Sequence, residues 1–188
     1  LRTRRQRQMC IRDRNNIPTL AYDDNEKSRE NLVNSKLDKV ILKHPKEYNW
    51  SEIDYLILSP GIPFTHPKPH YVVDLAIKHN CNIICDIEVL YHSQKDSKFI
   101  GITGTNGKST TTTLIGHILK ENAKESLIGG NLGICATDLD PLSSEGVYVL
   151  EMSSYQLDLI RDTHFNIAIL LNITPDHLDR HGDMQGYI

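Results

Sequence analysis

The segment 101–110, GITGTNGKST, contains the residue types that bind a phosphate chain. Backbone N–H groups can turn toward an anion where no side chain obstructs them, and Gly104 and Gly107 permit this approach. The Lys108 ammonium can place a positive charge on the β- and γ-phosphates, and the Ser109 hydroxyl can ligate Mg²⁺. The predicted nucleotide-binding residues are Gly104, Thr105, Asn106, Gly107, Lys108, Ser109 and Thr110.

This segment departs from the strict phosphate-loop pattern at one position. The pattern requires glycine five residues before Gly107, where this chain has Ile102. The simpler alternative is a glycine turn that leads into an ordinary helix. That alternative does not explain the four threonines 110–113, because β-branched residues are mildly unfavourable in a helix. We therefore favour phosphate binding.

Polar residues follow two later apolar runs. Glu151 ends the run VYVL, and a carboxylate at the carboxyl end of a strand faces the ligand crevice of an open α/β sheet. It is our candidate second ligand of Mg²⁺, although it also fits a first solvated residue after a strand. Ser153 and Ser154 come next, with hydroxyls suited to a polar substrate or to capping a helix through Gln156.

The second group is the segment 172–182, NITPDHLDRHG, which follows the apolar residues IAILL at 167–171 and overlaps the end of the strand predicted at 167–173. Its charged and histidine residues are too many for a core and more than a turn requires. Histidine is a common metal ligand, and a neighbouring carboxylate can orient the imidazole. A histidine in a loop is often only solvated, but the strand-end position favours His177 as a residue that faces the phosphates.

These residues need a parallel α/β framework, and the pattern of the chain predicts one. We expect strands at 19–23, 40–42, 53–58, 81–85, 99–103, 147–152 and 167–173. We expect helices within 25–36, 67–79 and 87–92, and from 108 to about 121. The turn signal Ser59-Pro60-Gly61 follows the third strand. A polar stretch at 93–98 places a domain boundary near Ser97, which gives domains of 15–97 and 98–188.

The composition is that of a soluble globular protein: 39% of the 188 residues are hydrophobic and 24% are charged. No apolar run approaches the ~20 residues of a membrane helix. Four cysteines at positions 10, 81, 85 and 135, without a secretory signal, suggest free thiols in the cytoplasm. Cys81 and Cys85 are interpreted as core residues, because no partner pair has zinc-site spacing.

The first 14 residues differ from the rest in charge. They hold six arginines and one acid, whereas residues 15–188 have a net charge of −8. A basic arm on an acidic body is one form of nucleic-acid tail. The segment lacks periodicity and its composition changes abruptly at Asn15, so we interpret it as a non-native or disordered extension and expect no nucleic-acid partner.

Three segments together, TGTNGKST, LEMSSYQLD and NITPDHLDRHG, resemble the Mur ligase family of peptidoglycan synthesis in their order and separation. Supporting matches are SPGI at 59–62, DIE at 86–88 and GGNLG at 129–133. The resemblance covers residues 15–188. It implies an incomplete Rossmann-like domain that binds a UDP substrate, followed by a partial P-loop-type ATP-binding domain with a parallel sheet.

The resemblance also implies an activity: ATP-dependent addition of D-glutamate to UDP-N-acetylmuramoyl-L-alanine through an acyl phosphate. ATP and Mg²⁺ would be the cofactors. The catalytic residues would be Lys108, Glu151 and His177, and the metal ligands Ser109, Glu151 and His177. The muramoyl substrate would contact Asn131 and Ser153, the uridine Asp23, Asp24 and Asn25, and the diphosphate Gly61. We expect a monomer without a membrane partner.

Two departures from the family pattern lead us to expect a fragment that is inactive alone. The family begins with a strand and a glycine-rich turn, where this chain has its arginine-rich segment. The chain stops at Ile188, before the lysine and the third domain that the family carries downstream. Two alternatives stay open: a ligase of folate polyglutamylation, and a nucleotide-binding module without catalysis.

Overall fold

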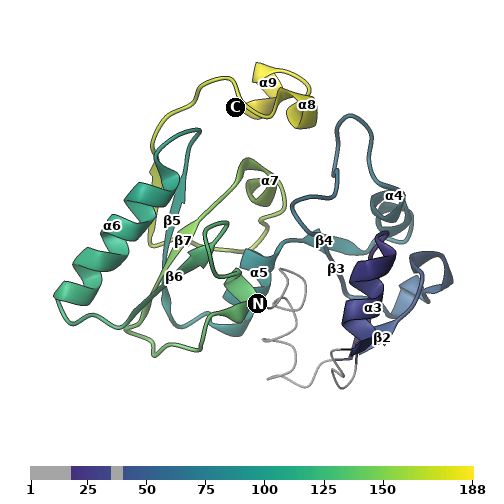
Figure 1. Cartoon of the computed structure of the whole chain (residues 1–188), viewed down its shortest axis with the longest axis horizontal. Coiled ribbons are helices and arrows are strands. Elements are labelled where there is room, and N and C mark those ends of the chain that lie inside the picture. The colour runs from purple at the N-terminus through teal and green to yellow at the C-terminus, as the bar shows by residue number, and fades with distance from the viewer. Residues whose placement is uncertain (1–17, 35–39) are drawn as a thin grey trace.

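The computed structural model describes residues 18–34 and 40–188, which form parallel sheets and helices (Figure 1). The strands are β1 Thr19–Ala21, β2 Val40–Leu42, β3 Tyr55–Ile57, β4 Asn82–Ile84, β5 Lys98–Thr103, β6 Ser126–Gly130, β7 Val147–Glu151 and β8 Ile167–Leu170. The α-helices are α3 Glu26–Asn34, α4 Tyr71–Lys78, α5 Asp86–Ser93, α6 Lys108–Glu121, α7 Ser154–Leu157, α8 Leu178–His181 and α9 Met184–Tyr187. Short 3₁₀ turns lie at η1 Pro45–Glu47, η2 Trp50–Glu52 and η3 Ala136–Asp138.

The predicted α/β class with parallel sheets is confirmed, because every strand pairing among the described residues is parallel. The predicted strands and helices are present, several with shorter bounds: the strand expected at 167–173 ends at Leu170. Strand β6 was not predicted, because its last two residues are glycines, which are poor strand formers. Residues 1–14 and Cys10 lie outside the described ranges.

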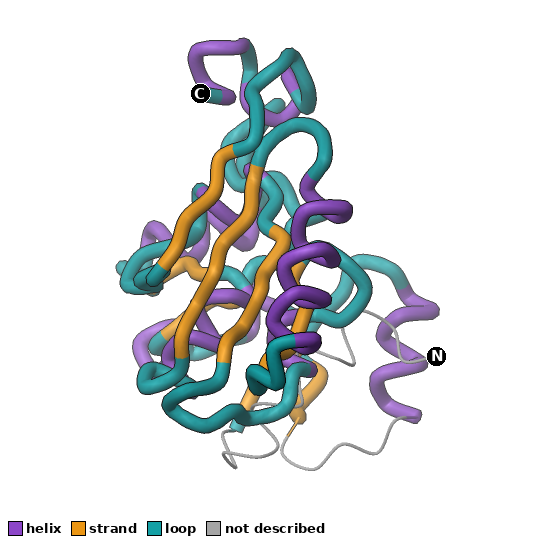
Figure 2. The backbone as a smooth tube through the Cα atoms, turned by 90° about the vertical axis from the view of Figure 1, so that its left-hand side faces the viewer, coloured by secondary structure: helices purple, strands orange, loops and turns teal. Residues whose placement is uncertain are grey.

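The four-stranded sheet has the order β6-β7-β5-β8, and its central strands are buried on both faces. Side chains alternate between the faces along a strand. On one face, Ile100, Ile102 and Val149 pack with Ile115 and Leu119 of α6. Helix α6 therefore covers this face, and in Figure 2 it lies on the viewer's side of the sheet.

The opposite face packs into a larger core. Phe99, Tyr148 and Leu150 join Ile87 and Leu90 of α5 in one buried cluster. The same cluster includes Trp50, Leu58 and Val73 from the N-terminal part of the chain. A single apolar core therefore runs across the position where we expected the domain boundary.

The N-terminal part holds two separate two-stranded sheets, β1-β2 and β3-β4. Between them lies an open groove of about 1290 Å³ lined by residues of β1, β3, α3 and α4. Apolar side chains remain exposed on these strands, with Ile41 55% and Tyr55 45% exposed. These strands are therefore much less enclosed than the central strands β5 and β7 of the four-stranded sheet.

Two smaller expectations can also be compared with the structure. Cys81, Cys85 and Cys135 are buried free thiols, as expected of core residues. Burial raises the pKa of the Cys85 thiol to about 12, with a smaller contribution from the neighbouring Asp86 carboxylate. Among the described residues, no helix combines the length and apolar character needed to cross a bilayer.

Candidate functional site

The predicted phosphate loop lies between the end of β5 and the start of α6, as expected. Gly104 has φ of +138° and Gly107 has φ of +85°, which are conformations that residues with a Cβ rarely adopt. A Cβ on Gly104 would also lie 3.1 Å from both the backbone nitrogen and the backbone oxygen of Asn172. Both glycines are therefore required by the shape of the loop.

The Lys108 ammonium lies across this loop. Its Nζ donates hydrogen bonds to the carbonyl oxygen of Gly104 at 2.6 Å and to that of Thr105 at 2.9 Å. The first N–H groups of α6 have no partner within the helix and carry the positive end of its dipole. The ammonium and the helix N-terminus thus place positive charge at the same loop.

Three predicted residues meet at the carboxyl ends of the strands. The Ser109 hydroxyl donates to Glu151 Oε2 at 2.7 Å, and Asn131 Nδ2 donates to Glu151 Oε1 at 3.0 Å. Glu151 is only 3% exposed and pairs in register with Ile102 of β5 and Gly130 of β6. A buried carboxylate beside a hydroxyl is an oxygen donor set of the kind that Mg²⁺ prefers.

Gly130 makes this meeting possible. Its φ is +93°, and a Cβ there would collide with the backbone oxygen of Glu151. The same oxygen accepts the N–H of Asn131 at 2.8 Å, which brings the Asn131 side chain toward the carboxylate. Gly130 of the GGNLG segment therefore permits a close approach between β6 and β7.

Ser153 takes the capping role that its position allowed. Its hydroxyl accepts the N–H of Gln156 at 3.3 Å, and Gln156 Oε1 in turn accepts the N–H of Ser153 at 3.0 Å, which forms a capping box at the start of α7. The capping alternative is confirmed. The role of Ser153 toward a substrate stays a prediction.

The hydrogen bonds and ion pairs of the described residues do not join His177 to Ser109 or Glu151. It precedes α8 with φ of +50°, its side chain is 48% exposed, and its Nε2 lies 3.5 Å from Asp176 Oδ2. Its ring centroid is 5.1 Å from that of Tyr155. The neighbouring Arg180 lies over the same tyrosine ring at 4.6 Å and donates to the Gly61 carbonyl at 3.5 Å. This segment therefore packs against α7 and the turn at Gly61.

Residues 23–25 form a compact turn after β1. Asp23 is buried, and its Oδ1 accepts the N–H of Asn25 at 2.9 Å. Asp24 Oδ2 lies 2.8 Å from His70 Nε2. Burial, and then the charge of Asp24, raise the pKa of Tyr71 to about 12. The structure brings these residues together, but at a different sheet from the phosphate loop.

Sequence reasoning missed Asn172 as a site residue. Its backbone oxygen accepts the N–H of Thr105 at 3.0 Å, and its side chain exchanges two hydrogen bonds with the backbone of Asn106. Thr174 N–H donates to the Thr105 hydroxyl at 2.9 Å. The available signal was the position of Asn172 directly after an apolar run, which is the same signal that identified Glu151.

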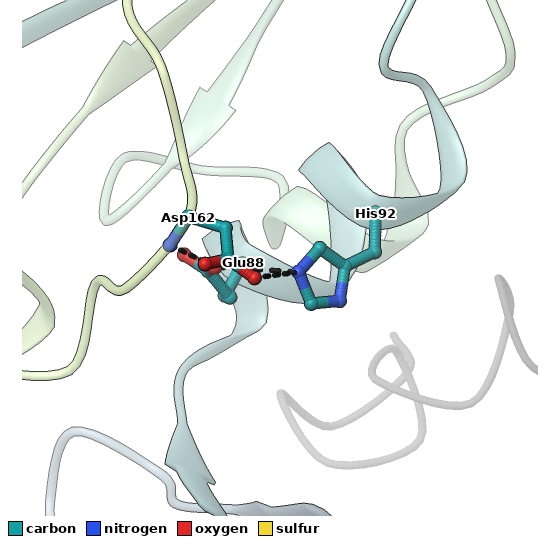
Figure 3. Close-up of side chains that lie close together, drawn as sticks. All are labelled: Glu88, His92 and Asp162. Atoms are coloured by element: carbon teal, nitrogen blue, oxygen red, sulfur yellow. Dashed lines mark hydrogen bonds and ion pairs between the residues drawn. The ribbon is translucent and has the colours of Figure 1, made fainter.

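A second cluster joins α5 to the loop after α7. The Glu88 carboxylate, 0% exposed, accepts the N–H groups of Arg161, Asp162 and Thr163 at 2.6–3.3 Å and the Thr163 hydroxyl at 2.5 Å. His92 Nε2 lies 3.3 Å from Glu88 and 3.2 Å from Asp162 (Figure 3). The three side chains are arranged like a set of metal ligands, but four hydrogen-bond donors already occupy the Glu88 oxygens. We therefore interpret the cluster as a structural joint, a set of contacts that holds α5 to the loop after α7.

The fold and this geometry define the class of protein. A parallel sheet carries a glycine-rich loop between a buried strand and a helix, with a buried carboxylate on the adjoining strand. This is an α/β protein of the P-loop type.

Comparison with known proteins identifies the family. Residues 102–188 match the Mur ligase middle domain. A protein of Wolbachia pipientis wMel is 50% identical over 171 residues, which are 89% of this chain and 32% of that protein. A protein of Paramagnetospirillum magneticum is 45% identical over 169 residues, 90% of this chain and 36% of that protein. Both are named UDP-N-acetylmuramoylalanine–D-glutamate ligase. The chain belongs to the Mur ligase family.

A solved structure supports the fold alone. The UDP-N-acetylmuramate:L-alanyl-gamma-D-glutamyl-meso-diaminopimelate ligase from Neisseria meningitides superposes with a TM-score of 0.55 at 17% identity, covering 96% of this chain and 60% of that one. The present chain spans about a third of the length of the curated relatives above.

Proposed function

We propose that this chain is the part of an ATP-dependent ligase that binds ATP and the UDP-linked substrate, and that the whole enzyme joins D-glutamate to UDP-N-acetylmuramoyl-L-alanine. The observation that carries the proposal is the meeting of Ser109 and Asn131 at the buried Glu151 beside the phosphate loop. The names of the relatives supply the substrates.

In this proposal ATP phosphorylates the alanyl carboxylate, and the amine of D-glutamate then attacks the acyl phosphate with release of phosphate. The chemical difficulty is the approach of two anions. The Lys108 ammonium and the first N–H groups of α6 bind and orient the phosphates. Ser109 and Glu151 would hold one Mg²⁺ and His177 a second, and these ions supply further neutralisation of the phosphate charge.

The other assignments are part of the same proposal. Residues 105–110 hold ATP, Asn131 and Ser153 contact the muramoyl group, residues 23–25 contact the uridine, and Gly61 lies near the diphosphate. Residues 15–97 would form the UDP-substrate domain and 98–188 the ATP-binding domain. We also propose that the protein acts in the cytoplasm as a monomer, without a nucleic-acid or membrane partner, and that the 188-residue chain is inactive alone.

A chimera tests this function. Residues 18–188 replace the matching residues of the Wolbachia relative, so that the remainder of that protein supplies its own segments. Release of phosphate from ATP should require both D-glutamate and UDP-N-acetylmuramoyl-L-alanine, and the same chimera with Lys108→Ala should release none. Turnover with a folate or another amino acid would reject the assigned substrates. If the chimera binds nucleotide but shows no turnover, the alternative of a nucleotide-binding module without catalysis would be favoured.

A further inference from the structure

We propose that Asn172 is a positioning residue that holds the phosphate loop in the conformation that binds the β- and γ-phosphates. This inference rests on the proposed ATP site. Asn172 follows β8, whereas the loop follows β5, so the contact joins two neighbouring strand ends.

The contact is a two-way amide clamp. Asn172 Oδ1 accepts the N–H of Asn106 at 2.9 Å, and Asn172 Nδ2 donates to the Asn106 carbonyl at 2.9 Å. The Asn172 backbone oxygen accepts the N–H of Thr105 at 3.0 Å. The side chain thus extends the β5–β8 ladder by one step beyond the point where the strands end, as a backbone would.

The N–H groups of the loop fall into two sets: some hold the loop in place, and others remain for an anion. Those of Thr105 and Asn106 are used to hold the loop. The N–H of Thr111 already bonds to the Gly107 carbonyl as the first bond of α6. The N–H groups between them, in the first turn of the helix, are left for an anion. Asn172 therefore acts on phosphate through Asn106 and not by touching it.

The chain offers a matched control at the opposite end of the same strand pair. Asn166 precedes β8, and its Oδ1 accepts the N–H of Phe99 at 2.7 Å. Both asparagines are exposed, and each uses its side-chain amide in a hydrogen bond to a backbone: Asn166 to that of β5, and Asn172 to that of the loop after β5. Only Asn172 lies at the loop.

The experiment measures binding of ATP and of AMP, each with Mg²⁺, to the 188-residue chain by calorimetry. Asn172→Ala should weaken ATP binding about 5-fold, as expected for the loss of the side-chain bonds at an exposed position. Asn172→Asp should weaken it about 10-fold or more, because it replaces the donor and adds a negative charge near the phosphates. Binding of AMP, which lacks those phosphates, should change by less than about 2-fold.

Asn166→Ala should lower the melting temperature without changing the affinity for ATP. Equal ATP affinity in wild type and both Asn172 variants would overturn the inference, as would equal losses for ATP and AMP. Hydrogen exchange gives a second readout without nucleotide: Asn172→Ala should speed exchange of the Asn106 amide, and an unchanged rate would also overturn it. A wild-type chain that binds no ATP would reject the proposed function, and the exchange rate would still decide the clamp.

Discussion

The four-stranded sheet and the N-terminal sheets differ in how completely they build a site. In the first, loop, hydroxyl and carboxylate converge from β5, α6 and β7, and the two central strands, β5 and β7, are buried on both faces. In the second, β1-β2 and β3-β4 stand on either side of an open groove, and Asp24 is engaged with His70.

The difference shows what a continuous parallel sheet contributes. Neighbouring strands in one sheet place their carboxyl ends side by side, so that segments distant in sequence come close together there. Ser109 and Glu151 are 42 positions apart and meet in this way. The two small sheets share no strand pairing in the described part of the chain, so their strand ends are not aligned by hydrogen bonds.

The largest expected effect concerns the joint between the two regions. Glu88→Ala removes a fully buried carboxylate that accepts four hydrogen bonds, and it leaves the N–H groups of Arg161, Asp162 and Thr163 without their acceptor. We expect a loss of about 4 kcal/mol in the free energy of unfolding, measured by urea denaturation. Glu145→Ala, at an exposed ion pair with Lys98, is the control and should leave the midpoint unchanged. A stable Glu88→Ala protein would show that the regions hold together without this joint.

A pair of glycine variants tests the close approach at the site. Gly130→Ala adds both backbone strain and a collision with the Glu151 oxygen, for which we expect about 3 kcal/mol of destabilisation. Gly133 also has positive φ, +62°, but nothing lies within 4 Å of its Cβ position. Gly133→Ala should therefore cost only the strain, about 1 kcal/mol. If thermal melts show that Gly130→Ala and Gly133→Ala lose the same stability, then β6 and β7 can move apart at no energetic cost.

Glu151→Gln tests the proposed role of Glu151 as a Mg²⁺ ligand. Wild type should bind ATP about 10-fold more tightly with Mg²⁺ than with EDTA, and the variant should lose most of that difference because a neutral amide is a poorer Mg²⁺ ligand. Glu125→Gln is the control, since Glu125 is an exposed carboxylate just before β6, at the other edge of the sheet. A variant with undiminished Mg²⁺ dependence would remove Glu151 from the metal site.

The smallest effect concerns Asp158 and pH. Burial raises the pKa of this carboxyl group, and the nearby His181 opposes the shift. A raised folded-state pKa of an acid favours the protonated form, so its contribution to stability is present below the unfolded pKa and is lost as pH rises through the folded pKa. Asp158→Asn should therefore be slightly more stable than wild type at pH 7, by less than about 0.5 kcal/mol since the side chain is 41% exposed, and equal to it at pH 3. If melting curves show that Asp158→Asn is less stable than wild type at pH 7, the expected direction of the effect is wrong.

Local signals account for what the sequence could predict. The glycines, Lys108 and the following helix are contiguous, and Glu151 closes an apolar run, so these local signals predicted a glycine loop between β5 and α6 and a carboxylate at a strand end. The contacts of Asn172 and Glu88 join residues 66 to 75 positions apart that carry no shared pattern. Strand β6 was hidden because Gly129 and Gly130, which its close packing requires, are residues that propensity assigns to turns.

The central claim is that the loop binds a triphosphate through Lys108 and the N-terminus of α6. Calorimetric titration of the 188-residue chain with ATP and Mg²⁺ tests it most directly, with Lys108→Ala beside Lys98→Ala, since Lys98 begins the same strand β5 that leads into the loop. We expect saturable binding that Lys108→Ala weakens about 100-fold and Lys98→Ala leaves unchanged. Equal affinity in all three proteins would contradict the account.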